Sequence, residues 1–196
     1  MPKRPGLTKE KLVDAAINII NQNGVSSLSI ASLAAKLNVK PPSLYNHMNS
    51  LKDLQRAIVL RGLKKFTQIG QEAAMGRAGY DALKAVATSY REFAKHQPGF
   101  YEITLQSNEG QDAELVVAEK EALEIFIGIL RGYNLEEEHA LHAIRAIRSS
   151  IHGFVALEVK GGFGLPLDIE ESFHYHLQIL DYGIKKIWGD NARLTP

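Results

Sequence analysis

Residues 28–54 constrain the fold of this chain more than any other stretch. Ser29 suits a helix N-cap, because its hydroxyl can accept a hydrogen bond from an unpaired backbone N–H, and apolar residues follow it at helical spacing. Asn38 tolerates the left-handed backbone of a tight turn. A second helix is expected to open at the pair Pro41 and Pro42, since proline has no hydrogen bond to lose in a first turn. The pattern predicts a helix-turn-helix.

The second of these helices is expected to bury one side and expose the other. Leu44 and Met48 lie four residues apart and should face the core. The residues between and before them are polar or aromatic and should lie on the outer arc. These outer residues are Ser43, Tyr45, Asn46 and His47. A short helix that presents such an arc is the kind that enters a DNA major groove.

A motif in this stretch resembles a known family. The pattern Leu-Tyr-x-His at residues 44–47, followed closely by Asp53 and Leu54, is similar to the DNA-binding domain of TetR-family transcriptional regulators. The similarity covers about the first third of the chain. The remainder resembles the family's ligand-binding and dimerisation domain in length and in its helix-only character. Within it, residues 152–154 and 161–164 resemble the WHG-type C-terminal subclass.

The resemblance implies an all-α fold with a three-helix, helix-turn-helix DNA-binding domain followed by a larger helical domain. Helical spacing of apolar residues continues to the end of the sequence, without strand alternation. Gly70, Gly76 and Gly79 interrupt the pattern. We therefore expect a boundary near Gly70, with residues 1–70 binding DNA and residues 71–196 binding an effector and dimerising.

The resemblance also implies which residues contact DNA. Tyr45 and His47 are expected to donate to phosphates, whereas Asn46 can bond adenine bidentately and Pro41 can touch a thymine methyl. A Tyr45 ring merely packed on the domain is the alternative. Many family members carry lysine at the position of Leu51, and here the nearest cation is Lys52 instead. The expected DNA-binding residues are Ser29, Lys40, Pro41, Ser43, Tyr45, Asn46, His47 and Lys52.

Charge is divided unevenly along the chain although its net charge is only +1. Residues 1–65 hold 11 Lys and Arg against 3 Asp and Glu, whereas residues 66–196 hold 12 against 19. A basic first third suits a polyanion, because phosphate neutralisation supplies most sequence-independent affinity for DNA. We expect the partner to be double-stranded DNA.

Composition excludes several other classes. The chain has no cysteine, so disulfides and thiolate chemistry are ruled out. No apolar run approaches the roughly 20 residues that cross a bilayer, and the basic amino terminus lacks the apolar stretch of a secretory signal. A cytoplasmic location without membrane contact is expected. Histidine pairs are better explained by packing or solvation than by zinc, so we expect neither metal nor cofactor.

An effector site is expected in the C-terminal domain. Phe126 and Phe154 are candidate walls, and Arg148 and His152 are candidate polar contacts, since they interrupt an otherwise apolar helix. The alternatives are aromatic residues that belong to the core and polar residues that form an internal salt bridge or an exposed face.

The last helix carries an apolar seam that predicts a homodimer. Its members recur at alternating spacings of four and three, and they are Phe173, Leu177, Leu180, Ile184 and Ile187. Gly153 would let a partner helix approach closely. Packing of the seam within one subunit is the alternative. A two-fold axis in such a dimer implies a pseudo-palindromic operator.

The combined interpretation is a sequence-specific transcriptional regulator, expected to be a repressor that a small molecule releases from its operator. One alternative is a constitutive DNA-binding repressor without an effector. A helical enzyme is the other, although the sequence lacks a glycine-rich phosphate loop, a nucleophile elbow and a zincin motif.

Overall fold

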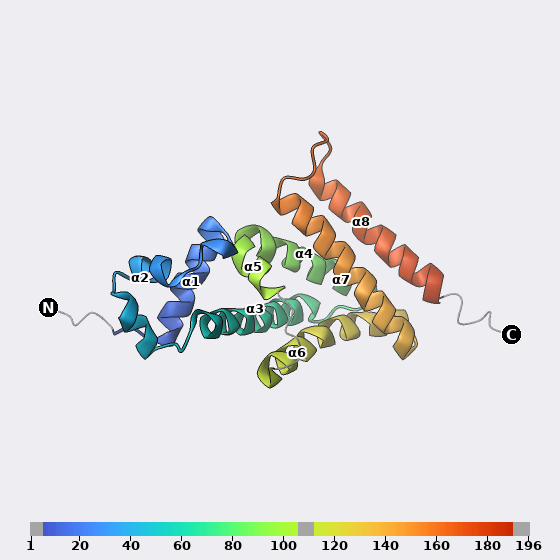
Figure 1. Ribbon diagram of the computed structural model, residues 1–196. Helices are drawn as coiled ribbons and strands as arrows, with labels where there is room; N and C mark the ends of the chain where they lie inside the picture. Colours follow the sequence, from blue (N-terminus) through green and yellow to red (C-terminus); the bar gives the residue numbers. More distant parts are fainter. Residues whose placement is uncertain (1–5, 106–111, 190–196) are drawn as a thin grey trace. The chain divides into compact units, whose positions relative to one another are not determined.

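A computed structural model describes residues 6–105 and 112–189, and within these ranges the chain is helical with no strand (Figure 1). The all-α fold class predicted from the sequence is confirmed. The α-helices of these ranges are α1 (Lys9–Asn23), α2 (Ile30–Leu37), α3 (Leu51–Ala74), α4 (Gly79–His96), α5 (Pro98–Thr104), α6 (Ala113–Leu130), α7 (Glu137–Val159) and α8 (Ile169–Ile184). The shorter helices are η1 (Val25–Ser27), η2 (Pro41–Asn46), η3 (Arg131–Tyr133) and the π-helical η4 (Lys185–Gly189).

Local capping fixes where several helices begin and end. The Thr8 hydroxyl accepts a hydrogen bond from the Lys11 N–H at 3.3 Å and so caps α1. Gly24 ends that helix with a φ of 82°, in the region that favours glycine. At the other end of the chain, the Asp168 carboxylate accepts from the Glu170 N–H at 2.8 Å and begins α8.

Contacts divide the chain into two compact units. The first unit comprises Met1–Lys65 and His96–Ala118, and the second comprises Phe66–Lys95 and Glu119–Pro196. The long helices α3 and α6 each contribute residues to both units. The boundary expected near Gly70 therefore differs from the division that contacts make, and it lies inside α3.

The first unit has an apolar core made by α1, α2, η2 and α3. Its most deeply buried members are 0% exposed, and they include Leu12, Ile20, Leu33, Leu44, Leu54 and Ile58. Burying such side chains stabilises a fold by about 1.5–3 kcal/mol each. The helix-turn-helix is thus held by side chains from each of its helices and from the helix on either side of it.

The short helix α5 is part of this first unit. A Cβ placed on Gly99 would lie only 2.0 Å from the carbonyl oxygen of Ile20, so α5 approaches α1 backbone to backbone. The Phe100 N–H donates to Asn21 Oδ1 at 2.8 Å. Helix α1 therefore draws support from a residue 79 positions away in the sequence.

The second unit is built around α4, α7 and α8. Leu83, Ile147 and Leu177 each have 1% or less of their surface exposed. Helices α7 and α8 run antiparallel, joined by the loop that follows α7 (Figure 1). Within the described ranges, no helix combines the length and apolarity that spanning a membrane requires.

Gly70 has a different role from the one expected of it. The sequence interpretation expected a domain boundary at this residue, but α3 continues through Gly70 to Ala74. A Cβ on Gly70 would lie 2.6 Å from Ile125 Cδ1, so the missing side chain lets α3 and α6 pack closely. A glycine that serves close helix packing and one that loosens a helix give the same sequence signal.

Candidate nucleic-acid interface

The helix-turn-helix begins with a reciprocal cap. The Ser29 hydroxyl accepts from the Ser32 N–H at 3.0 Å, and the Ser32 hydroxyl accepts from the Ser29 N–H at 2.9 Å. Ser29 is thereby confirmed as the N-cap of α2, and Ser32 takes the part that glutamate usually plays in a capping box. Both hydroxyls are occupied in this arrangement, so the structure gives Ser29 a capping role, and its contact with DNA stays a prediction.

The turn between the two helices has the predicted geometry. Asn38 adopts φ 52° and ψ 50°, the left-handed conformation, and its N–H donates back to α2. The Val39 N–H donates to the Ala34 carbonyl at 3.0 Å. These bonds fix the direction in which the chain leaves α2 and enters the next helix.

That next helix, η2, is a 3-10 helix. Lys40 precedes it in an extended conformation with ψ 141°, as expected of a residue before proline. The Ser43 N–H donates to the Lys40 carbonyl at 2.9 Å, which is the bond to the third residue back that defines this tighter helix. Pro41 and Pro42 have no N–H, so neither can add a hydrogen bond to the first turn.

The two sides of η2 are sharply different. Leu44 is 0% exposed and Met48 is 3% exposed, so both face the core as predicted. Tyr45 is 54% exposed. Lys40, Pro41 and Asn46 are also exposed, whereas Ser43 and His47 are half-buried. The predicted contact residues therefore lie on and beside one short helix, and the opposite side of this helix is packed into the core.

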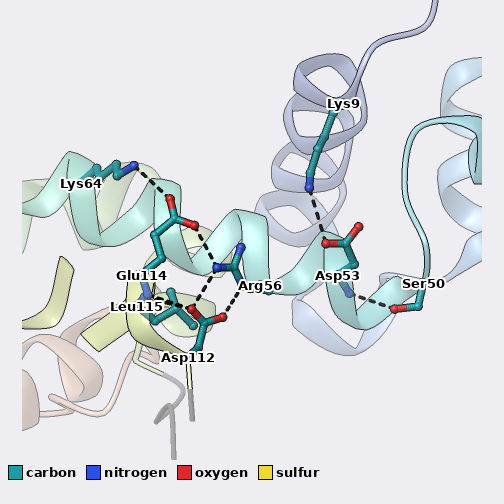
Figure 2. Close-up of polar contacts among 8 residues, drawn as sticks. All are labelled: Lys9, Ser50, Asp53, Arg56, Lys64, Asp112, Glu114 and Leu115. Atoms are coloured by element: carbon teal, nitrogen blue, oxygen red, sulfur yellow. Dashed lines mark hydrogen bonds and ion pairs between the residues drawn. The ribbon is translucent and has the colours of Figure 1, made fainter. Parts of the chain in front are cut away.

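The connection from η2 to α3 is held by Asp53, whose role was not anticipated. Its carboxylate accepts from the Asn49 N–H at 3.2 Å. The same carboxylate lies 3.5 Å from the Lys9 ammonium of α1 (Figure 2). The Ser50 hydroxyl in turn accepts from the Asp53 N–H at 3.1 Å. The spacing Ser50-x-x-Asp53 is similar to a capping box and would have predicted the Ser50 cap, although the Asp53 carboxylate accepts from the N–H one residue before the N-cap.

Three lysines flank η2 in the sequence of the helix-turn-helix and the start of α3. Lys36 ends α2, Lys40 precedes η2 and Lys52 lies in the first turn of α3, and all three are exposed. In the part of the chain that the structure describes, none of the three has a carboxylate within ion-pairing distance. Lys36 was missed by the sequence interpretation. Its position in the last turn of the first helix of the motif was the available signal.

Several other cations of the first unit are paired with carboxylates. Arg56 forms a bidentate pair with Asp112 and a 2.9 Å bond to Glu114, which also lies 3.7 Å from Lys64 (Figure 2). The hydrogen bond from Arg56 is the main reason that the pKa of the Asp112 carboxyl falls to about 2. Among the described residues, Arg56 and Lys64 of α3 are thus paired with carboxylates, whereas Lys36, Lys40 and Lys52 are not.

Of the predicted effector residues, three lie on α7 and Phe126 lies on α6. Phe126 is buried and stacks on Phe66 with ring centroids 6.3 Å apart. Phe154 is half-buried and packs on Phe163 at 4.8 Å. Arg148 is exposed and His152 is half-buried. Burial lowers the pKa of His152 below its usual value of 6.5, so its ring favours the neutral form.

A buried arginine was overlooked in the apolar pattern of α4. Arg91 is 1% exposed, and its guanidinium donates twice to the Glu158 carboxylate at 2.6 Å and once to Glu170 at 2.7 Å. It also lies over the Phe173 ring, 4.7 Å from the centroid. Arg91 falls on the apolar side of α4, four residues after Ala87 and three before Ala94, and this position was the available signal. The sequence could not reveal which carboxylates, 67 and 79 residues away, would meet it.

The seam predicted to form the dimer interface packs largely within the chain, which corrects that prediction. Phe173, Leu177 and Ile184 are only 4%, 1% and 3% exposed, because α8 turns this side toward the rest of its own unit. Leu180 is half-buried. Ile187 and Gly153 remain exposed. A partner subunit could therefore reach only the last two freely.

The opposite side of α8 presents a second apolar stripe. Tyr175, Ile179 and Tyr182 recur at spacings of four and three, and they are 54%, 70% and 69% exposed. On the neighbouring helix α7, Leu157 is 51% exposed. Gly153 has nothing within 4 Å of the position that a Cβ would take. This set of residues, which we call the α7–α8 face, is the available surface for a partner.

The described residues contain no group of three His, Asp or Glu side chains arranged to hold a metal ion.

Sequence comparisons give consistent matches. Residues 83–180 match the family model of the tetracyclin repressor-like C-terminal domain. The chain is 37% identical over 184 residues to an uncharacterized HTH-type transcriptional regulator, YobS, of Bacillus subtilis (strain 168), covering 94% of this chain and 96% of that protein. It is 38% identical over 156 residues to another, Rv0681 of Mycobacterium tuberculosis, covering 79% and 72% respectively.

A solved structure shares the fold at lower sequence identity. A TetR variant from Acinetobacter baumannii AYE in complex with minocycline superimposes with a TM-score of 0.70. It is 21% identical and covers 93% of this chain and 98% of that one. The likeness extends over both the helix-turn-helix and the helical remainder.

Proposed function

The chain belongs to the TetR family of DNA-binding transcriptional regulators, and from this premise we propose that it is a homodimeric repressor that a small-molecule effector releases from a pseudo-palindromic operator. Its relatives are transcriptional regulators, so the enzyme alternative is set aside. A cytoplasmic location is part of the proposal, because the operator is chromosomal or plasmid DNA.

One observation carries the DNA-binding part of the proposal. The polar outer arc of η2 is exposed next to three unpaired lysines, while Leu44 and Met48 anchor the inner side. A side chain that enters a groove must be exposed, and the backbone that holds it must be rigid. We propose that Tyr45 and His47 donate to phosphates and that Asn46 reads a base edge.

The cations near η2 fit the sequence-independent part of binding. Lys36, Lys40 and Lys52 have no carboxylate partner among residues 6–105 and 112–189, so each can neutralise a phosphate without loss of an ion pair seen in these ranges. Lys52 lies at the N-terminus of α3, where the helix dipole adds to its attraction for an anion. We propose that Lys52 takes the place of the lysine that many family members carry one residue earlier.

The α7–α8 face supports a two-fold dimer. Its three exposed α8 side chains follow helical spacing, and Gly153 allows close approach of a partner backbone. Large apolar side chains exposed together on a soluble domain mark an interaction surface. Two recognition helices related by a two-fold axis meet successive major grooves when they lie about one helical turn, ~34 Å, apart. The operator is then an inverted repeat.

Effector release is proposed because the family fold accommodates a small molecule in the minocycline complex of the Acinetobacter baumannii protein. A ligand weakens operator binding only by its differential affinity for the two states of the protein. A tenfold loss needs about 1.4 kcal/mol of coupling, and operator DNA must weaken the ligand by the same factor. A repressor without an effector is the alternative, and it would show no such reciprocity.

The DNA-binding assignment is tested by two substitutions with different expected results. Tyr45→Phe should lower affinity about tenfold for every sequence, because a phosphate contact carries no base information. Asn46→Ala should relax preference at one base pair by about 1–3 kcal/mol. Gel-shift titrations against the selected operator and against single-base variants separate the two effects.

Thr88→Ala, an exposed change on α4, is the matched control and should behave as the wild type. Lysine variants give a third measure, since Lys36→Ala should reduce the slope of log affinity against log salt by about 1. Wild-type affinity and specificity in both η2 variants would refute the assignment.

A further inference from the structure

A groove of about 390 Å³ opens on the first unit, where α1, α3 and the start of α5 meet. Its volume is that of a site for a small molecule. All of its lining residues belong to the unit that also carries η2, and they are Asp14, Ile17, Asn18, Arg61, Lys65, Gln97 and Phe100. The groove is therefore separate from the second unit and from the effector residues expected there.

Two glycines hold α5 against the other two helices of the groove. Gly99 brings α5 onto the α1 backbone at Ile20, as described above. A Cβ on Gly62 would lie 2.0 Å from Thr104 Oγ1, so α3 also packs closely on α5. Because close contacts fix α5 on two sides, the walls of the groove are formed before any ligand arrives, which lowers the cost of binding.

The groove combines an apolar floor with two amides. Phe100 is 4% exposed and Ile17 is half-buried, so a flat apolar molecule resting on them would gain burial. Asn18 and Gln97 line the groove from α1 and from the N-cap of α5. Each amide can donate and accept hydrogen bonds, so neither selects a charge.

The charged side chains of the groove leave one positive charge in surplus. Arg61 of α3 forms an ion pair with Asp14 of α1, and this pair links two of the walls. Lys65 lies one turn further along α3 and is exposed. Within the part of the chain that the structure describes, no carboxylate lies within ion-pairing distance of Lys65. The surplus charge of the lining is therefore that of its ammonium group.

This lysine lies apart from the proposed DNA contacts. Lys65 follows Leu51, the first residue of α3, by 14 positions, which places it about 20 Å along the helix. Lys52 and η2 lie at the N-terminal end of α3. A small molecule in the groove is therefore a better partner for Lys65 than an operator phosphate.

We propose that this groove binds a small organic monoanion, with its carboxylate at Lys65 and a flat apolar body on Phe100 and Ile17. One negative charge matches the one surplus positive charge of the lining. A cation would be repelled by Lys65 and find Asp14 already paired with Arg61. The site requires no effector in the second unit, so it stands independently of the proposed function.

Four probes test the chemistry of the ligand on the full-length protein. Naphthoate is an anion, naphthamide has the same shape without charge, naphthylmethylammonium is a cation and acetate is an anion without a ring. Calorimetric titration should give a naphthoate affinity about tenfold above that of naphthamide, the lower end for a hydrogen bond to a charged group. Naphthylmethylammonium should bind more weakly than naphthamide, and acetate at least about tenfold more weakly than naphthoate.

Substitutions at Lys65 locate the charge. Lys65→Gln should make the naphthoate and naphthamide affinities equal, and Lys65→Glu should reverse the preference in favour of naphthylmethylammonium. Lys64→Gln is the matched control, because Lys64 lies 3.7 Å from Glu114 and does not line the groove. It should keep the preference for naphthoate. A merely structural role for Lys65 would not change the ratio of these affinities.

Substitutions at Asn18 locate the groove. Asn18 is an exposed lining residue of α1, so a larger side chain there can fill the groove without disturbing the core. Asn18→Phe should weaken naphthoate binding at least about tenfold, whereas Asn18→Ala is the matched control and should retain it. Circular dichroism confirms that both variants fold.

Operator binding without any probe distinguishes the ligand site from a DNA contact. Lys65→Gln should keep the wild-type operator affinity and its salt dependence. A slope of log affinity against log salt that falls by about 1 would instead assign Lys65 to a phosphate and overturn the inference.

Four results with the probes would also overturn it. These are no saturable binding of naphthoate, equal affinities for naphthoate and naphthamide in the wild type, a preference that survives Lys65→Gln, or undiminished binding in Asn18→Phe. Intact operator binding alongside any of these results would refute the anion site and leave the proposed function standing.

Discussion

If the α7–α8 face forms the dimer interface, the exposed side chain of Ile179 on α8 should contribute strongly to dimer stability. Ile179 is 70% exposed within the chain, whereas Leu177, two residues earlier, is 1% exposed. Ile179→Glu should therefore separate the subunits and leave each one folded. Leu177→Ala should instead destabilise the subunit itself, by about 2–5 kcal/mol, because it opens a cavity in the core.

The size of the effect follows from the exposed surface. Complete burial of an isoleucine side chain contributes about 1.5–3 kcal/mol, so the exposed 70% of Ile179 accounts for about 1–2 kcal/mol per copy. The two-fold axis makes each residue count twice, which gives about 2–4 kcal/mol per dimer. That loss weakens dimerisation by about 30- to 1,000-fold, before the cost of burying a carboxylate is added.

Sedimentation equilibrium over a range of protein concentrations measures this change, with circular dichroism as the check on folding. Val117→Glu is the matched control, since Val117 is a 55% exposed apolar residue on α6. It should leave the dimer intact. A monomeric wild-type protein, or an Ile179→Glu variant that dimerises as strongly as the wild type, would refute the assignment of the face.

Three further predictions concern stability. Arg91→Met should lower the free energy of unfolding by about 3–5 kcal/mol in urea titrations, because it leaves buried carboxylates without their partner; a loss below 1 kcal/mol would contradict this role. The folded-state pKa of Asp112 lies below its usual 3.8, so its pair with Arg56 should stabilise the protein above that pH and lose this effect as the pH falls toward about 2. Melting temperatures should show this drop in the wild type and not in Asp112→Asn, and parallel curves would count against it. Gly99→Ala should cost about 1–3 kcal/mol in thermal unfolding because its Cβ meets the α1 backbone, and an unchanged melting temperature would disprove the close approach.

Local signals predicted the helix-turn-helix well. Ser29 as a cap, Asn38 in the left-handed turn and the inward pair Leu44 and Met48 each depend on residues within four positions of one another. Such short-range preferences act before any tertiary contact forms. The 3-10 form of η2 was not predicted, because helical spacing over six residues does not separate the two helix types.

The features that could not be predicted from the sequence depend on contacts between residues far apart in the chain. The partners of Arg91 and Arg56 lie more than 50 residues away, and no local pattern selects one carboxylate over another. The prediction that the seam of α8 forms the dimer interface went wrong for a related reason. Leu177 and Ile179 belong to opposite apolar stripes of the same helix, and spacing alone does not say which stripe meets its own subunit.

The central claim is that this chain binds a two-fold symmetric operator through η2. Selection of DNA by the purified full-length protein from a random pool tests it most directly. We predict an enriched inverted repeat whose half-sites lie about one helical turn apart, and loss of enrichment at one base of each half-site for Asn46→Ala. A pool without an enriched motif, or a motif without two-fold symmetry that Asn46→Ala selects unchanged, would contradict the claim.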